Sequence, residues 1–390
     1  MTGGLLKCVH LVTLMDMKRM EAHILILAGG LILLSLTAGC RTISLNLKKK
    51  LPPPPKETVI EPVQSASAHH APAANQQAQV TTQQSQNTDP AEPQLTHDKV
   101  LLSQANTYII KGDLQSALVK FEQAIVENPK LLPAYIGAGR IYHGQGDYAL
   151  AEAKFEEATR IAPTSFQAHY YLGLMRQLLK KYPLAIKAFL YALAINPEDF
   201  AANHNLSICY LQIGRAAEAA PYALKATKLN KNSQAAWANL GSSYNVMSLY
   251  EKAIRAYRQA NELGEPTEPI LLGLAEAHMR LENFDRAKIV LKQVIADFPS
   301  AVAHERMGYA LFKQRKYDES MQQFRAALLF DPDDTASLNG LGVCMMTKYI
   351  ANGRTVQLQC EQALSAWRRS LEITPNQPQI TNLLQSFGQG

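Results

Sequence analysis

Residues 237–260 read WANLGSSYNVMSLYEKAIRAYRQA and contain two short apolar patterns of helical spacing. Leu240 and Tyr244 stand four residues apart in the first half, and Ala253 and Tyr257 stand four apart in the second. Steps of three and four residues bring side chains onto one face of an α-helix. The stretch therefore predicts two consecutive amphipathic helices.

The same pattern recurs along the chain with a period close to 34 residues. Prolines end most of the units, at Pro129, Pro163, Pro197, Pro266, Pro299, Pro332 and Pro375. Counting back gives eight units that begin near Asp98, Leu132, Phe166, Phe200, Gln234, Glu268, Ala301 and Thr335, the eighth with a 9-residue insert. A fixed period in this range indicates a solenoid, in which each unit buries its apolar face only against its neighbours.

Two places in each unit carry the packing signal. The twentieth is small, usually Ala. The twenty-fourth is large and mostly aromatic, as in Phe121, Phe155, Phe189 and Tyr257, with Ala223 and Leu291 departing. Between the two helices of a unit, Gly112, Gly146 and Gly214 stand where a helix C-terminus favours a left-handed residue. We therefore expect tight helix–turn–helix units, with the large residue between adjacent pairs.

These residues resemble the tetratricopeptide repeat. Leu240-Gly241-x-x-Tyr244 after Trp237 matches the form of its first helix, and Ala253-x-x-x-Tyr257-x-x-Ala260 matches its second. The resemblance implies an all-α, right-handed superhelical solenoid of about eight repeats over residues 98–377, with 378–390 as a C-terminal cap or tail. Repeats 6 and 8 depart from the pattern, with His278 and Met345 in the tyrosine place.

The resemblance also implies a binding site. In this family the first helices line a concave groove, and an extended peptide or an amphipathic helix is the expected guest. The groove residues that it implies are Ile136, Arg140, His143, Gln167, Tyr170, Leu174, Gln177, His204, Ile208, Leu211, Tyr309 and Phe312, with Glu305, Asn339, Val343 and Met346 at equivalent places. The alternative is that several of these side chains pack against neighbouring repeats instead.

A second feature precedes the repeats. Lys18 and Arg19 are followed by an uncharged stretch, residues 24–36, and then by Thr37-Ala38-Gly39-Cys40. A basic segment, an apolar core and small residues before a cleavage point are typical of a secretory signal. Because it ends on Cys, the stretch resembles a bacterial lipobox.

Residues 1–39 are therefore interpreted as a lipoprotein signal peptide, and Cys40 as the lipidated residue. The true translation start is expected at Met15, Met17 or Met20. An uncleaved membrane anchor and a simple secretory signal are the alternatives. The apolar stretch is short for a transmembrane helix, which needs about 20 residues.

Residues 40–97 differ in composition from the repeats. They begin with Cys40 and continue with four successive prolines from Pro52 and many Gln, Ala, Ser and Thr residues, but no aromatic residue. Such a segment buries too little apolar area to offset its ordering entropy, so we expect a disordered tether. In bacterial lipoproteins the residue after the Cys directs sorting, and Arg41 implies the outer membrane, facing the periplasm.

Patterns typical of an enzyme, a metal site or a cofactor site are missing. There is no Cys-x-x-Cys or His-x3-His spacing and no Gly-x-Ser-x-Gly elbow, and Gly137-x-Gly139 is interpreted as close helix packing rather than a phosphate loop. A net charge of +6 over 390 residues argues against a nucleic-acid binder. Cys344 and Cys360 flank the insert, and a disulfide between them is a further hypothesis.

These observations favour a membrane-tethered scaffold that binds proteins, without a cofactor. The arrangement of lipid, spacer and repeats resembles that of the outer-membrane assembly lipoproteins of tight-adherence (TadD-like) and type IV pilus systems. An adaptor that recruits peptidoglycan enzymes or proteases is the alternative. The repeat portion of a glycosyltransferase is a third hypothesis.

Overall fold

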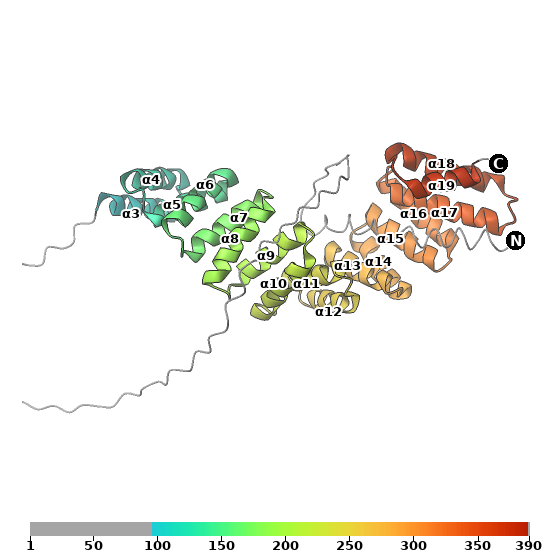
Figure 1. The fold of residues 1–390 in the computed structure, drawn as a ribbon, viewed down its shortest axis with the longest axis horizontal. Helices are drawn as coiled ribbons and strands as arrows, with labels where there is room; N and C mark the ends of the chain where they lie inside the picture. Colours follow the sequence, from blue (N-terminus) through green and yellow to red (C-terminus); the bar gives the residue numbers. More distant parts are fainter. Residues whose placement is uncertain (1–95, 389–390) are drawn as a thin grey trace, which may run out of the picture. The chain divides into compact units, whose positions relative to one another are not determined.

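The structure, a computed structural model, describes residues 96–388, and every regular element of this part is an α-helix (Figure 1). The helices come in sequential pairs. The first helices are α3 (His97–Ile110), α5 (Leu132–Gln145), α7 (Phe166–Leu178), α9 (Phe200–Gln212), α11 (Gln234–Val246), α13 (Glu268–Arg280), α15 (Ala301–Lys313) and α17 (Thr335–Ala351). The second helices are α4 (Leu114–Glu127), α6 (Tyr148–Ile161), α8 (Tyr182–Ile195), α10 (Ala216–Leu229), α12 (Tyr250–Glu262), α14 (Phe284–Asp297), α16 (Tyr317–Phe330) and α18 (Gln357–Ile373). A single helix, α19 (Pro378–Phe387), follows.

The predicted all-α solenoid of helix pairs is confirmed. Each helix packs against the next one along the chain, both within a pair and between pairs. Seven of the eight first helices begin at the residue given by the repeat count, and α3 begins one residue earlier, at His97. The insert in the eighth unit lengthens both of its helices to 17 residues.

The signal peptide, Cys40 and most of the tether, residues 1–95, lie outside the described residues. The hypotheses about them stay predictions.

The turn inside each pair requires a left-handed residue. Gly112, Gly146 and Gly214 have φ angles of 77°, 86° and 75°. In four other repeats Lys180, Ser248, Glu282 and Arg315 adopt the same conformation, with φ between 57° and 62°. A side chain in this conformation costs about 1–2 kcal/mol. Packing of the two helices therefore imposes the turn in these repeats, whether or not a glycine is present.

The large residue that most second helices carry at the twenty-fourth place fills the space between first helices. Phe121 and Phe155 are almost completely buried, at 1% and 0% exposure. A Cβ added to Gly137 would stand 2.3 Å from Phe121 Cζ, and one added to Gly139 would stand 2.8 Å from Phe155 Cζ. The pair of glycines that superficially suggests a phosphate loop therefore serves helix packing, as predicted.

The last repeat is covered by α19. Ile380 and Leu383 of this helix are 1% and 4% exposed and belong to the same core cluster as Trp367 of α18. A terminal helix that buries the open side of the last unit is the usual end cap of a solenoid.

Candidate functional site

The first helices of successive repeats come close to one another. Apart from the sequential contacts, α7 meets α9, α9 meets α11, α11 meets α13 and α15 meets α17, whereas no two second helices meet to the same extent. The family resemblance predicts the fifth, ninth and twelfth residues of the first helices on this side. We call the surface that they form the inner face.

Tyr170 of α7 is the centre of an aromatic group on the inner face. Its ring stacks on Phe166 at 5.8 Å and lies 5.5 Å from Tyr171 and 6.0 Å from Phe189, centroid to centroid. The Asn205 amide of α9 donates to its hydroxyl at 3.5 Å. The side chain is half-buried, and this burial, followed by the negative charge of Asp199, raises the pKa of the phenol. Tyr170 thus links repeats 3 and 4 and still presents part of its surface.

Apolar side chains continue this surface onto α9. Leu174 and Ile208, at the ninth places of α7 and α9, are half-buried. Leu211 is only 6% exposed and Ile136 only 7%, so these two belong to the core between repeats. Some predicted groove residues therefore pack against neighbouring repeats, which was the alternative. Others keep accessible area, as expected for a groove.

Two polar atoms beside this surface have no partner. His204 stacks on Phe200 at 5.7 Å, and its Nδ1 is buried without a hydrogen bond. Burial lowers the pKa of His204, so the ring is neutral at pH 7. Gln177 Oε1 of α7 is likewise buried and unpartnered. Buried polar atoms are normally paired, so a water or a ligand can complete the hydrogen bonding of these two atoms, as it can for Asn245 Oδ1 and Glu276 Oε2 in repeats 5 and 6.

The remaining predicted groove residues are spread along the array. Arg140 and Gln167 are exposed, and the His143 ring lies 6.0 Å from that of Tyr148. In repeat 7, Lys313 lies over the Tyr309 ring at 5.4 Å, and Phe312 contacts the Tyr317 ring at 5.7 Å. These residues do not join the group around Tyr170, and their role in binding stays a prediction.

The inner face of repeats 5 and 6 is different, and the sequence reasoning did not single it out. The hydroxyl of Tyr257 lies 3.2 Å from that of Ser242, and the Asn245 amide donates to the Gly273 carbonyl at 2.9 Å. Arg280 Nε donates to Glu276 Oε1 at 2.6 Å. Glu276 is only 3% exposed, and burial raises the pKa of Tyr257 to about 12. The signal was present in the polar residues at place nine of both first helices, Ser242 and Glu276, and at place twelve of α11, Asn245.

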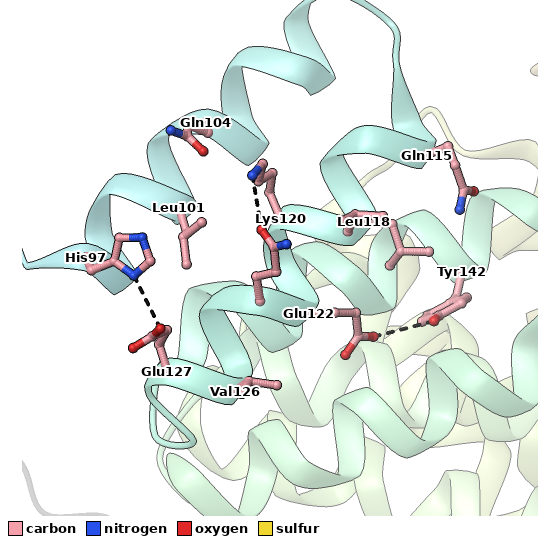
Figure 2. Close-up of a pocket in the computed structure, with 12 residues that line it drawn as sticks. His97, Leu101, Gln104, Gln115, Leu118, Lys120, Glu122, Val126, Glu127 and Tyr142 are labelled. Carbon is pink, nitrogen blue, oxygen red and sulfur yellow. Dashed lines mark hydrogen bonds and ion pairs between the residues drawn. The ribbon is translucent and has the colours of Figure 1, made fainter.

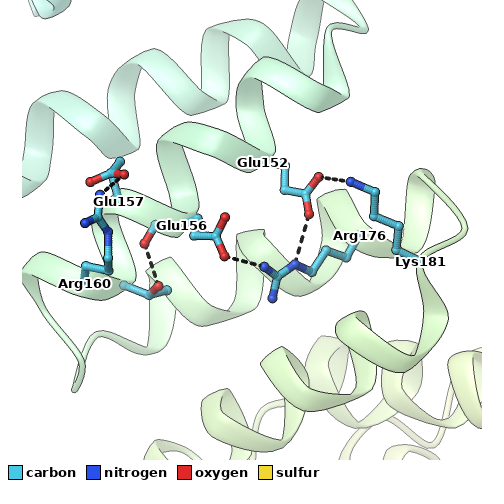
Figure 3. A network of polar contacts seen from close by, with 7 residues as sticks. Glu152, Glu156, Glu157, Arg160, Arg176 and Lys181 are labelled. Atoms are coloured by element: carbon cyan, nitrogen blue, oxygen red, sulfur yellow. Dashed lines mark hydrogen bonds and ion pairs between the residues drawn. The ribbon is translucent and has the colours of Figure 1, made fainter.

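A polar network joins repeats 2 and 3 on another side (Figure 3). Buried Glu152 accepts from Arg176 Nε at 3.1 Å and from Lys181 Nζ at 2.6 Å, and Arg176 Nη2 donates to Glu156 at 2.7 Å. Burial alone would raise the pKa of Glu152, but the hydrogen bonds from Lys181 and Arg176 outweigh it and keep the pKa below its ordinary value. The network holds two repeats together and leaves no free group for chemistry.

A surface hollow of about 800 Å³ lies along α3 and α4 (Figure 2). It is bordered by apolar residues such as Val119 and Val126, and by the His97–Glu127 pair, whose Nδ1 and Oε1 atoms are 3.3 Å apart. These residues do not form a nucleophile–base pair or any other recognisable catalytic group.

The three cysteines of the described residues are buried free thiols: Cys209, Cys344 and Cys360. Cys344 Sγ lies 3.3 Å from the Ser320 hydroxyl, and burial raises the pKa of both Cys209 and Cys344 to about 12. Cys344 and Cys360 belong to one core cluster, where both are free. The hypothesis of a disulfide between them stays a prediction. Residues 96–388 contain no group of three His, Cys, Asp or Glu side chains placed to hold a metal, and none of their helices is both long and apolar enough to span a bilayer.

The family profile for the Tetratricopeptide repeat matches residues 102–166, 136–200, 179–233 and 272–344, which together make up more than half of the chain. The chain belongs to the tetratricopeptide repeat family. It is a protein-binding scaffold of this family, with no catalytic domain evident in the described residues. No curated protein matches the sequence.

The chain is also similar to solved structures, at low identity. A repeat protein from Parabacteroides merdae is 17% identical, with 64% of this chain and 98% of that chain covered and a TM-score of 0.44. YrrB, described as having an unusual peptide-binding site, is 21% identical over 51% and 99%, with a TM-score of 0.41. PilF of Pseudomonas aeruginosa is 19% identical over 56% and 97%, with a TM-score of 0.44. Similarity of this degree says nothing about the partner of this chain.

Proposed function

We propose that the inner face of repeats 3 and 4 is the binding site for a partner protein, which enters as an extended peptide or an amphipathic helix. The observation that carries this proposal is the accessible apolar surface of Tyr170, Leu174 and Ile208 beside the unpartnered atoms of Gln177 and His204. Apolar area gives affinity, and a bound backbone or side chain would supply the missing hydrogen bonds.

Photo-cross-linking tests this assignment. A photoreactive amino acid at Gln167, which is exposed on α7, should capture the partner in cells. The same amino acid at Lys187, which is exposed on the second helix α8 of that repeat, is the matched control. Capture from Lys187 and not from Gln167 would assign the partner to another surface.

The proposal extends to the N-terminal part of the sequence. A lipid on Cys40 would hold the protein at the bacterial outer membrane, facing the periplasm, and residues 41–97 would let the repeats reach a partner. The order of lipobox, spacer and repeats supports a role in assembling an envelope complex such as a pilus or secretion system. An adaptor for peptidoglycan enzymes or proteases would also need a membrane anchor, a spacer and a protein-binding surface, and it is the alternative.

Substitution of Cys40 tests the anchor. Acylation requires the sulfur of this residue, so Cys40→Ala should abolish labelling by a radioactive fatty acid and leave the protein either soluble or with its signal segment uncleaved. Continued labelling and membrane retention of the variant would exclude the lipoprotein assignment. A deletion strain then separates the two pathways: loss of surface pili supports the first, and altered peptidoglycan turnover with normal pili supports the second.

A further inference from the structure

One place on the second helices changes charge in a regular way along the array. It is the twenty-fifth place of each unit, directly after the twenty-fourth, for example Glu122 after Phe121 and Arg258 after Tyr257. From repeat 1 to repeat 8 this place holds Glu122, Glu156, Leu190, Leu224, Arg258, Lys292, Arg325 and Arg368. Two acids are thus followed by two leucines and then by four bases, on equivalent faces of α4 to α18.

In the first repeats, this place makes contacts across the boundary to the next repeat. Lys154 Nζ donates to Glu122 Oε2 at 2.7 Å, and the Tyr142 hydroxyl donates to Glu122 Oε1 at 3.4 Å. Arg176 Nη2 donates to Glu156 at 2.7 Å, as Figure 3 shows. Both acidic side chains therefore find a partner within the chain, and Tyr142 and Arg176 both occupy the eleventh place of a first helix.

In repeats 5 to 8 the same place has no such partner. The eleventh places that follow are His278, Leu311 and Met345, none of which carries a negative charge. Arg258, Lys292, Arg325 and Arg368 are all exposed, and none of them forms an ion pair with another residue of the part that the structure describes. We call these four residues the basic ladder.

The buried His278 lies at the boundary between repeats 5 and 6, close enough to Arg258 to be affected by its charge. It is only 2% exposed, and its Nδ1 has no hydrogen-bond partner. Its burial lowers the pKa of the imidazole, and the positive charges of Arg258 and Arg286 lower the pKa further. The boundary between repeats 5 and 6 therefore combines an unpaired polar group with like charges, where the boundary between repeats 2 and 3 contains a neutralised network.

We propose that the basic ladder is a second binding surface, separate from the inner face, and that it takes an acidic segment of a partner protein. The regular spacing, one cation per repeat, suits carboxylates distributed along an extended chain. The ladder is narrow, because exposed acids occupy the first turns of three of its four helices, at Glu251, Asp285 and Asp318. A broad anionic surface, such as a lipid bilayer, would bring these acids against its own charge.

Binding of a defined acidic probe tests the proposal with the full mature chain. The probe is a fluorescein-labelled peptide of alternating Glu and Ser, measured by fluorescence anisotropy at low salt, beside a Gln–Ser peptide of equal length. The ladder variant combines Arg258→Gln, Lys292→Gln, Arg325→Gln and Arg368→Gln. The control variant combines Lys130→Gln, Lys187→Gln, Lys228→Gln and Lys231→Gln, which are exposed, without ion pairs in the described region, and equal in charge change.

The ladder variant should bind the Glu–Ser peptide at least about tenfold more weakly than the unmodified chain, and the control variant should stay within about threefold. Equal weakening in both variants would show a net-charge effect and overturn the proposal, as would unchanged binding in the ladder variant. Ladder-dependent binding to vesicles rich in phosphatidylglycerol, without binding to the peptide, would replace the acidic protein segment by a membrane. The four single variants, each at an exposed site, repeat the test should the combined variant lose helical content.

Discussion

Repeats 3 and 5 have the same backbone arrangement but different inner faces. At the twenty-fourth place repeat 3 carries Phe189 and repeat 5 carries Tyr257, and both are buried. Tyr170, half-exposed, lies 6.0 Å from the Phe189 ring, whereas the hydroxyl of Tyr257 pairs with Ser242 at 3.2 Å. Repeat 3 thus has an accessible aromatic surface, and repeat 5, whose core ring carries a hydroxyl, has an internal polar network instead. The repeat pattern determines where a side chain lies. The residues that it contacts determine whether it stays accessible or joins an internal hydrogen bond.

Removing either core ring should have the largest effect and should show that both rings serve the same packing role. Phe189→Ala and Tyr257→Ala should each lower the free energy of unfolding by about 3–5 kcal/mol, because each leaves a cavity between two repeats. Urea denaturation followed by circular dichroism measures both. A loss below about 1 kcal/mol for one of them would mean that this repeat can close over the cavity.

Truncating the accessible surface should separate binding from folding. Tyr170→Ala combined with Leu174→Ala should weaken capture of the partner by at least ~2 kcal/mol while helical content persists, since aromatic and apolar anchors dominate interface energies. Calorimetry or quantitative pull-down measures the loss.

Two substitutions serve as controls for this double variant. Ser242→Ala changes the inner face of repeat 5, and Glu156→Ala removes only a partly exposed ion pair with Arg176. Both should leave partner capture unchanged. Because Tyr170 also packs between repeats, the comparison is made at equal fold stability. Full binding by the double variant, with a loss in Glu156→Ala, would assign the site to the second helices.

Exchanging the hydroxyl between the two rings should sharpen the comparison at a smaller scale. Tyr257→Phe removes the contact with Ser242 and should cost about 1 kcal/mol of stability. Phe189→Tyr places a hydroxyl in an apolar cluster and should cost about 1–3 kcal/mol. Thermal melts of the two variants measure the difference. A stabilising Phe189→Tyr would reveal a hydrogen-bond acceptor at this place.

The smallest effect concerns pH. His204 in repeat 4 and His278 in repeat 6 both have a pKa lowered from 6.5, first of all by burial. Their contribution to stability is therefore complete above pH 6.5 and is lost as the pH falls through the folded-state values, because the unfolded chain takes up the protons first. The melting temperature should fall between pH 7 and pH 5, by a few degrees.

Replacing these histidines tests the assignment. His204→Gln and His278→Gln together should flatten this pH dependence. An unchanged slope in the double variant would mean that other groups cause the pH dependence.

Much of the fold follows from the sequence, because every repeat has nearly the same pattern of small and large residues and therefore packs in the same way. The 34-residue period, the small residue at place twenty and the large one at place twenty-four place the first helices to within a residue. The glycine turns were predicted in three repeats, but the left-handed Lys180 and Ser248 were not. There the local preference opposes the conformation, and contacts between the two helices override it.

The candidate site was less predictable than the fold. Family resemblance selects the first-helix places, but Ile136 and Leu211 at those places are buried, whereas Tyr170 and Leu174 keep accessible area. Exposure depends on the size of the residues opposite, which belong to repeats 34 positions away in the sequence. The order of acids, leucines and bases behind the basic ladder is visible in the sequence once the repeats are aligned. Only the contacts of Glu122 and Glu156 in the structure show that the acids are paired within the chain and the bases are not.

The sequence by itself determined the repeat, the helices and their order, since periodic apolar residues and local turns depend on neighbours along the chain. The tertiary structure decided which of these side chains remain accessible and which polar groups are left without a partner. Accessibility and pairing are properties of two surfaces brought together. In this protein the two surfaces come either from the two helices of one repeat, as for Ser242 and Tyr257, or from different repeats, as for Glu152 and Arg176. For the same reason the buried Glu152 forms an ion pair with Arg176 of the next repeat, while the exposed Arg258 has no ion-pair partner in the described residues.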